Sequence, residues 1–249
     1  MIAAVGGTRV PDRTYGQFCP VAMASEILCT RWTVVLLREL LAGSTRFNEL
    51  RRGVPRMSPA LLSQRLKELE EAGIVERVPI EREPGVNEYA ITPAGRELKP
   101  IVEAFGCWGQ RWVSSELSLE QLDASLLMWD MRRGLLRGTM PSRRCIIQFQ
   151  FHDQSVASRK WWIVANPDEP IELCQIDPGH EVDLYVRCDL RTMTAIWMGH
   201  ERIGEAVDAG RLILTGPDRL VAQFQDWLGL SPFAKVEKPP VHLAVSNAA

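Results

Sequence analysis

Apolar residues in the stretch 32–72 recur every three to four positions, as they do along helices that bury one face. They form three stripes, in residues 32–42, 46–54 and 58–72. Gly43 ends the first stripe and Pro55 stops the second, while Ser58 is a favourable N-cap for the third. A shorter apolar segment at 20–28 predicts a further helix. The spacing therefore predicts a small helical unit with a shared core.

After Gly73 the pattern changes to that of a β-hairpin. Residues 74–78 and 88–91 read as strands, and the turn residues at 83–87 join them. Two helices with a tight connection, followed by a hairpin, form a winged helix-turn-helix, in which one helix enters a DNA groove. Residues 44–92 therefore predict a DNA-binding module.

The helix expected at 58–72 carries polar residues opposite its apolar stripe. Such a face is usually only solvated, but the neighbouring hairpin favours contact with DNA. Amide and cationic side chains reach base edges and phosphates, and an arginine beside the hairpin turn suits a minor groove or a phosphate. The candidate DNA-binding residues are Arg46, Ser58, Ser63, Gln64, Lys67 and Arg82.

A long helix is expected from residue 94 to about 114. Its stripe is too apolar for a lone surface helix and consists of Leu98, Ile101, Val102, Phe105, Trp108 and Trp112. We expect this face to be buried against a partner subunit, with a core against a second domain as the alternative.

Beyond about residue 118 strands and helices alternate. Alternation of side chains predicts strands at 144–151, 159–164, 171–175, 182–188 and 210–216. Helices are expected from Ser118 to about Leu135, and at 189–198, 202–208 and 217–228. The second half is therefore expected to be α+β, with a curved antiparallel sheet on which helices pack.

Five of the eight tryptophans lie in this second half. Large apolar side chains either line a ligand pocket or simply fill a core, and both readings remain open. The candidate ligand-binding residues are Trp129, Phe149, Trp161, Trp197, Phe224 and Trp227.

Composition narrows the functional classes. The chain is 46% hydrophobic and 24% charged, which is typical of a globular protein. It shows no signal peptide, no transmembrane run and no paired-cysteine framework, so we expect a cytoplasmic protein with reduced thiols. Residues 1–112 carry 15 Lys/Arg against 13 Asp/Glu, and residues 113–249 carry 14 against 18. No catalytic, cofactor or metal motif is present, so we expect neither an enzyme nor a cofactor.

Several segments of the first half together resemble the HxlR family of bacterial winged-helix regulators. They include RFNEL from Arg46, SQRLKELEEAG from Ser63 and TPAG from Thr92. This resemblance implies a homodimer, joined through its N-terminal and last helices, on a pseudo-palindromic double-stranded operator. Cys19 falls where several members of the family carry a cysteine that senses oxidants or electrophiles.

Residues 120–235 resemble the sterol carrier protein type 2 fold in their order of elements and in segments such as GRLILTG from Gly210. This resemblance implies an apolar tunnel for lipid-like ligands. The expected domains are a flexible arm (1–16), a winged-helix DNA-binding and dimerisation domain (17–114), a ligand-binding domain (118–235) and a tail (236–249).

The sequence is therefore compatible with three functions. The first is a homodimeric transcriptional regulator whose DNA affinity responds to a hydrophobic effector in the second domain. The second is a redox- or electrophile-sensing regulator acting through Cys19. The third is a lipid-carrier protein whose winged helix serves protein contacts.

Overall fold

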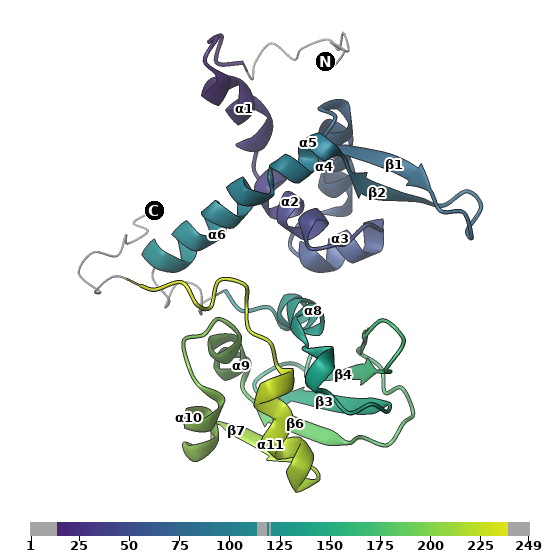
Figure 1. Ribbon diagram of the computed structural model, residues 1–249, viewed down its shortest axis with the longest axis vertical. Helices are drawn as coiled ribbons and strands as arrows, with labels where there is room; N and C mark the ends of the chain where they lie inside the picture. The colour runs from purple at the N-terminus through teal and green to yellow at the C-terminus, as the bar shows by residue number, and fades with distance from the viewer. Residues whose placement is uncertain (1–13, 114–118, 120, 239–249) are drawn as a thin grey trace. The chain divides into compact units, whose positions relative to one another are not determined.

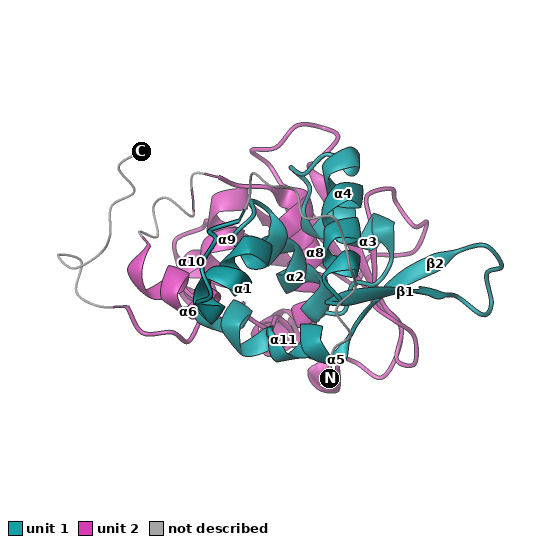
Figure 2. Cartoon of the chain, turned by 90° about the horizontal axis from the view of Figure 1, so that it is seen from above, with its two compact units in different colours: residues 1–104 teal, residues 105–249 magenta. Residues whose placement is uncertain are grey.

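The computed structural model describes residues 14–113, 119 and 121–238. The chain divides into two compact units, residues 1–104 and 105–249, drawn in separate colours in Figure 2. The expected N-terminal arm, the N-cap at Ser118 and the C-terminal tail lie wholly or mostly outside the described residues.

The first unit is helical with one hairpin (Figure 1). In chain order its elements are α1 (Pro20–Leu28), α2 (Thr33–Leu41), α3 (Phe47–Gly53), α4 (Pro59–Glu71), β1 (Val75–Pro79), β2 (Asn87–Ile91) and α5 (Pro93–Glu97). The structure thus confirms the predicted winged helix-turn-helix. β1 and β2 pair antiparallel, from Val75 opposite Ile91 to Pro79 opposite Asn87.

The long helix expected from residue 94 is broken in two. α5 ends at Glu97, and α6 (Lys99–Trp112) begins after Leu98. Pro100 supplies the physical reason, because it has no N–H to donate to the preceding turn and fits only at the start of a helix.

The predicted apolar stripes meet in one core. Its fully buried members come from α2, α3 and α4, and include Leu36, Leu37, Leu50, Leu62 and Leu66. Ser58 caps α4 as predicted, since its Oγ accepts from the N–H of Leu61 at 3.3 Å. Burial of one face of α4 leaves the opposite face in solvent.

A buried carboxylate fixes α3 against α2. Glu39 is fully buried, and its Oε1 accepts from Ser44 Oγ at 2.5 Å. Arg38 Nη2 donates to Glu39 Oε2 and to the carbonyl oxygen of Gly53, both at 3.1 Å. A Cβ on Gly53 would lie only 2.0 Å from Glu39 Cδ, so glycine is required where α3 ends.

The second unit is α+β. Its elements are α8 (Ala124–Gly134), η2 (Arg137–Thr139), β3 (Cys145–Phe151), β4 (Lys160–Ala165), β5 (Glu172–Cys174), β6 (Leu184–Cys188), α9 (Leu190–Trp197), α10 (Ile203–Asp208), β7 (Leu212–Thr215) and α11 (Asp218–Trp227). Each of the predicted strands and helices appears there, with shifted ends.

The expectation of an antiparallel sheet is wrong at one pairing. The strand order is β5-β4-β3-β6-β7, and β3 pairs with β6 in parallel, with Ile147 opposite Leu184. The chain runs outward from β3 through β4 and β5, and then crosses to the other side of β3. Because β3 and β5 run in the same direction, the connection after β5 returns the chain to the end of the sheet at which β3 starts. β6 therefore runs parallel to β3, and the sheet is mixed.

α6 spans the boundary between the two units. Val102 is buried in the core of the first unit, whereas Gly106 packs on the ring of Phe233 and Gln110 Nε2 donates to the carbonyl of Met198 at 3.1 Å. Phe105 and Trp108 are 58% and 55% exposed. The helix thus joins the second unit while leaving part of its apolar stripe uncovered.

No single helix in the described ranges is both long and apolar enough to span a membrane. α1 and α2 together would have that length and composition, but they are bent by 81° at their junction.

Candidate nucleic-acid interface and ligand cavity

The exposed face of α4 carries the polar residues predicted from the sequence. Ser63, Gln64 and Lys67 all lie in solvent, since Leu62 and Leu66 hold the opposite face in the core. Gln64 Nε2 donates to Glu68 Oε1 at 3.0 Å, and Lys67 Nζ lies 3.6 Å from a carboxylate oxygen of Glu71. An amide and an ammonium group one turn apart are suited to a base edge and a phosphate.

Arg65 anchors this helix. The sequence analysis did not predict this role. Its side chain is buried, and its Nε donates to the carbonyl oxygen of Arg31 at 3.2 Å. It also pairs with Glu68. A signal was available, because Arg65 follows the buried Leu62 by three positions and so lies beside the apolar stripe.

The hairpin is tied to the start of α3. The N–H of Tyr89 donates to the carbonyl oxygen of Thr45 at 2.8 Å, and Thr45 Oγ1 donates to Glu88 at 2.7 Å. Arg82, on the turn, is exposed and has no ion pair or hydrogen bond with any described residue. The predicted wing is therefore tied to the start of α3 along β2, and its turn carries an exposed cation.

Arg46 lies immediately before α3 and is engaged by the wing. Its Nη1 and Nη2 donate to the two carboxylate oxygens of Glu83, at 3.0 and 2.5 Å. These hydrogen bonds hold the pKa of Glu83 below its ordinary value. The sequence reading missed this partner, because no periodicity relates residues 37 positions apart on a loop and a helix end.

Cys19 occupies the N-cap position of α1. The backbone N–H groups of Ala22 and Val21 lower the pKa of its thiol. This effect requires no basic neighbour, and Pro20 at the first helical position was the available signal in the sequence. Cys29 caps the other end, about 15 Å away at 1.5 Å per residue, beyond disulfide reach within one chain.

The six predicted ligand-binding aromatics are buried in the second unit. Trp129, Phe149, Trp161, Trp197, Phe224 and Trp227 are each at most 6% exposed. Phe149 and Trp227 each pack on Phe224 with ring centroids 6.4 Å apart. These side chains lie in the hydrophobic core of the second unit.

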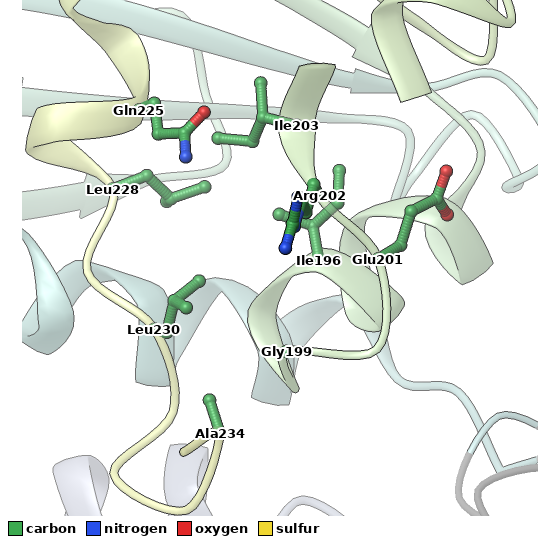
Figure 3. A pocket seen from close by; sticks show the side chains of 9 residues that line it. All are labelled: Ile196, Gly199, Glu201, Arg202, Ile203, Gln225, Leu228, Leu230 and Ala234. Atoms are coloured by element: carbon green, nitrogen blue, oxygen red, sulfur yellow. The ribbon is translucent and has the colours of Figure 1, made fainter. Parts of the chain in front are cut away.

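A cavity of about 340 Å³ lies beside this core (Figure 3). Its lining comes from the end of α9, the start of α10 and the segment between them, and from the end of α11 and the segment after it: Ile196, Gly199, Glu201, Arg202, Ile203, Gln225, Leu228, Leu230 and Ala234. Glu201 pairs with Arg211, and its carboxylate points away from Leu228. The remaining lining is mostly apolar. None of the six predicted aromatics lines it, and only the tertiary structure brings these segments together.

No group of three or more His, Cys, Asp or Glu within the described ranges is arranged to hold a metal ion.

Comparisons with known proteins match most of the first unit together with α6. A model of the HxlR-like helix-turn-helix family matches residues 27–117. The HTH-type transcriptional regulator YvaP of Bacillus subtilis is 39% identical over 98 residues, which are 39% of this chain and 91% of YvaP. The HTH-type transcriptional regulator YdeP of the same organism is 34% identical over 94 residues, which are 38% of this chain and 73% of YdeP. Among solved structures, the redox regulator HypR in its reduced form has 36% identity and a TM-score of 0.35, covering 37% of this chain and 91% of HypR.

Proposed function

The chain belongs to the HxlR-like helix-turn-helix family, and from that premise we propose how this DNA-binding transcriptional regulator recognises DNA and is controlled. The relatives are transcriptional regulators, a class that generally lacks enzymatic activity. The proposal rests on the exposed polar face of α4. Arg65 holds this helix in place, and the wing, which is hydrogen-bonded to the start of α3, flanks it. The residues proposed to contact DNA are Arg46, Ser58, Ser63, Gln64, Lys67 and Arg82.

In this proposal α4 enters a major groove. The amide of Gln64 reads a base edge, while the ammonium group of Lys67 binds a phosphate one helical turn away. Arg82 reaches the adjacent minor groove or backbone from the wing. Such a regulator acts on DNA in the cytoplasm.

We propose that the protein acts as a homodimer. α6 leaves Ile101, Phe105 and Trp108 at least 45% exposed, and α1 leaves Val21 72% exposed. Exposed apolar side chains of this size mark association surfaces. Two α4 helices would then read a pseudo-palindromic operator with half-sites about 34 Å apart.

Binding to duplex DNA from the chain's own promoter region tests this function. We expect tighter binding to that duplex than to a mixed-sequence duplex of equal length. Equal affinity for the two duplexes would contradict sequence-specific regulation.

We further propose that residues 118–235 form a domain similar to sterol carrier protein type 2, which binds a hydrophobic effector. The cavity between α9, α10 and α11 supports this proposal, since its size suits a small molecule and most of its lining is apolar. The buried aromatics serve as its supporting core. An effector regulates only if it favours one of the DNA-competent and incompetent states.

Leu230→Trp should weaken binding of a hydrophobic probe, because Leu230 lines the cavity and is 45% exposed, so a larger ring occupies the space without disturbing the core. We expect at least a severalfold weaker titration of anilinonaphthalene sulfonate fluorescence, and loss of any apolar molecule seen by native mass spectrometry. Leu136→Trp, at a 53% exposed leucine outside the cavity, is the control. Equal binding by both variants would remove the cavity from the proposal.

A thiol-based regulator acting through Cys19 is the second candidate, favoured by the N-cap position of this thiol. Helix N-terminal amides stabilise a thiolate, the form that reacts with oxidants and electrophiles. In this alternative the second unit has only a structural role. Modification of the Cys19 thiol then changes how α1 packs against neighbouring residues.

The pH dependence of alkylation tests Cys19. Because the pKa of this thiol is lowered, its thiolate persists to lower pH, and its reaction with iodoacetamide should have a midpoint below that of N-acetylcysteine. Peptide mass spectrometry measures the rate at Cys19. The regulatory role requires in addition that an oxidant release DNA from the wild type but not from Cys19→Ser; release from both would exclude Cys19 as the sensor.

A further inference from the structure

Glu83 lies on the turn of the wing and faces the start of α3. Its two carboxylate oxygens accept from both terminal nitrogens of Arg46, at 3.0 and 2.5 Å. A planar guanidinium binds a carboxylate and a phosphate through the same two-pronged geometry. Glu83 therefore occupies the position on Arg46 that a DNA phosphate would take.

The wing does not depend on this pair for its attachment. The bonds from Tyr89 and Thr45 hold β2 to the start of α3. The side chains of Arg46 and Glu83 are 45% and 43% exposed, and exposed ion pairs contribute little to stability. The pair can therefore open in water while the wing stays in place.

We propose that Glu83 is an intramolecular competitor of DNA phosphate for Arg46, and that it lowers the affinity of this surface for any duplex. The inference rests on the proposed contact between Arg46 and DNA. Arg46 can bind a DNA phosphate only after that phosphate displaces the Glu83 carboxylate. A DNA backbone that is poorly placed for this exchange therefore gains no affinity from Arg46. Glu83 thereby weakens sequence-independent binding to DNA, while the positive charge of Arg46 is kept.

Glu83→Gln tests the inference, since it preserves shape and removes the competing charge. The probe is a mixed-sequence duplex, titrated by fluorescence anisotropy at several salt concentrations. We expect binding tighter by about 1.4- to fivefold per wing, and a salt dependence of log K against log salt steeper by up to about 0.9 per wing.

Glu81→Gln is the matched control. It makes the same change of charge two positions away, and Glu81 has no ion pair or hydrogen bond with the described residues. Glu83→Gln should increase the affinity for the duplex more than Glu81→Gln does. This difference should vanish when Arg46 is replaced by Met. Equal affinity of the two variants, or a difference that persists in the absence of Arg46, would overturn the inference.

The two proposals fail differently. If the wild type shows no salt-dependent binding to any duplex, the proposed DNA-binding function fails. If the wild type binds and Glu83→Gln behaves as Glu81→Gln does, only the role of Glu83 fails.

Discussion

Gly53→Ala is expected to lower the free energy of unfolding of the first unit by about 2–4 kcal/mol, from overpacking and from disruption of a buried hydrogen-bonded carboxylate. The added Cβ would lie 2.0 Å from Glu39 Cδ and 2.2 Å from Oε2. Glu39 is enclosed and bound to Ser44, so it can move only by breaking that bond or by shifting α3. Thermal unfolding followed by circular dichroism should show a fall on the order of 10–20 °C in the transition of this unit.

Gly109→Ala provides the control, because Gly109 is also helical and a Cβ there meets nothing within 4 Å. It should be neutral, or stabilising by up to about 1 kcal/mol from helix propensity. In a Glu39→Ala background the cost of Gly53→Ala should largely disappear. An equal cost in both backgrounds would show that the carboxylate is not the cause.

Gln64→Ala and Lys67→Ala are expected to weaken binding to the promoter duplex for different reasons. Loss of the amide removes a base contact, and should reduce affinity about 5- to 150-fold per half-site, from about 1–3 kcal/mol. Loss of Lys67 removes a phosphate contact, so it should weaken binding to all duplexes and reduce the salt slope by about 1 per half-site. Both are read by anisotropy titration.

Lys99→Ala is the matched control for Lys67→Ala. Lys99 and Glu103 on α6 form an i,i+4 pair at 3.8 Å, comparable to Lys67 and Glu71 at 3.6 Å. Both lysines are exposed, so each substitution removes one charge and one weak surface pair. If the two variants lose affinity equally, the effect comes from net charge and not from the face of α4.

Local periodicity was sufficient to predict most of the elements. The positions of Leu50, Leu62 and Leu66 indicated the buried faces of α3 and α4, and so left Gln64 and Lys67 in solvent. These predictions succeed because helix spacing and caps depend on residues within a few positions of one another.

Features that depend on long-range pairing were not predicted. The parallel pairing of β3 with β6 follows from the path of the chain and leaves no local signal. The same holds for Glu83 on Arg46, and for the cavity, whose lining joins segments around residues 200 and 230. Composition alone does not separate a core from a pocket lining, so the sequence left both interpretations open for the six aromatic residues.

The salt dependence of binding to the promoter duplex tests the central claim most directly. The measurement is an anisotropy titration of the wild type at several salt concentrations, with the mixed-sequence duplex alongside. A DNA-binding regulator predicts tighter binding to the promoter duplex and a linear fall of log K with log salt. Absence of binding, or binding without a salt slope, would contradict it and favour a carrier protein whose winged helix contacts other proteins.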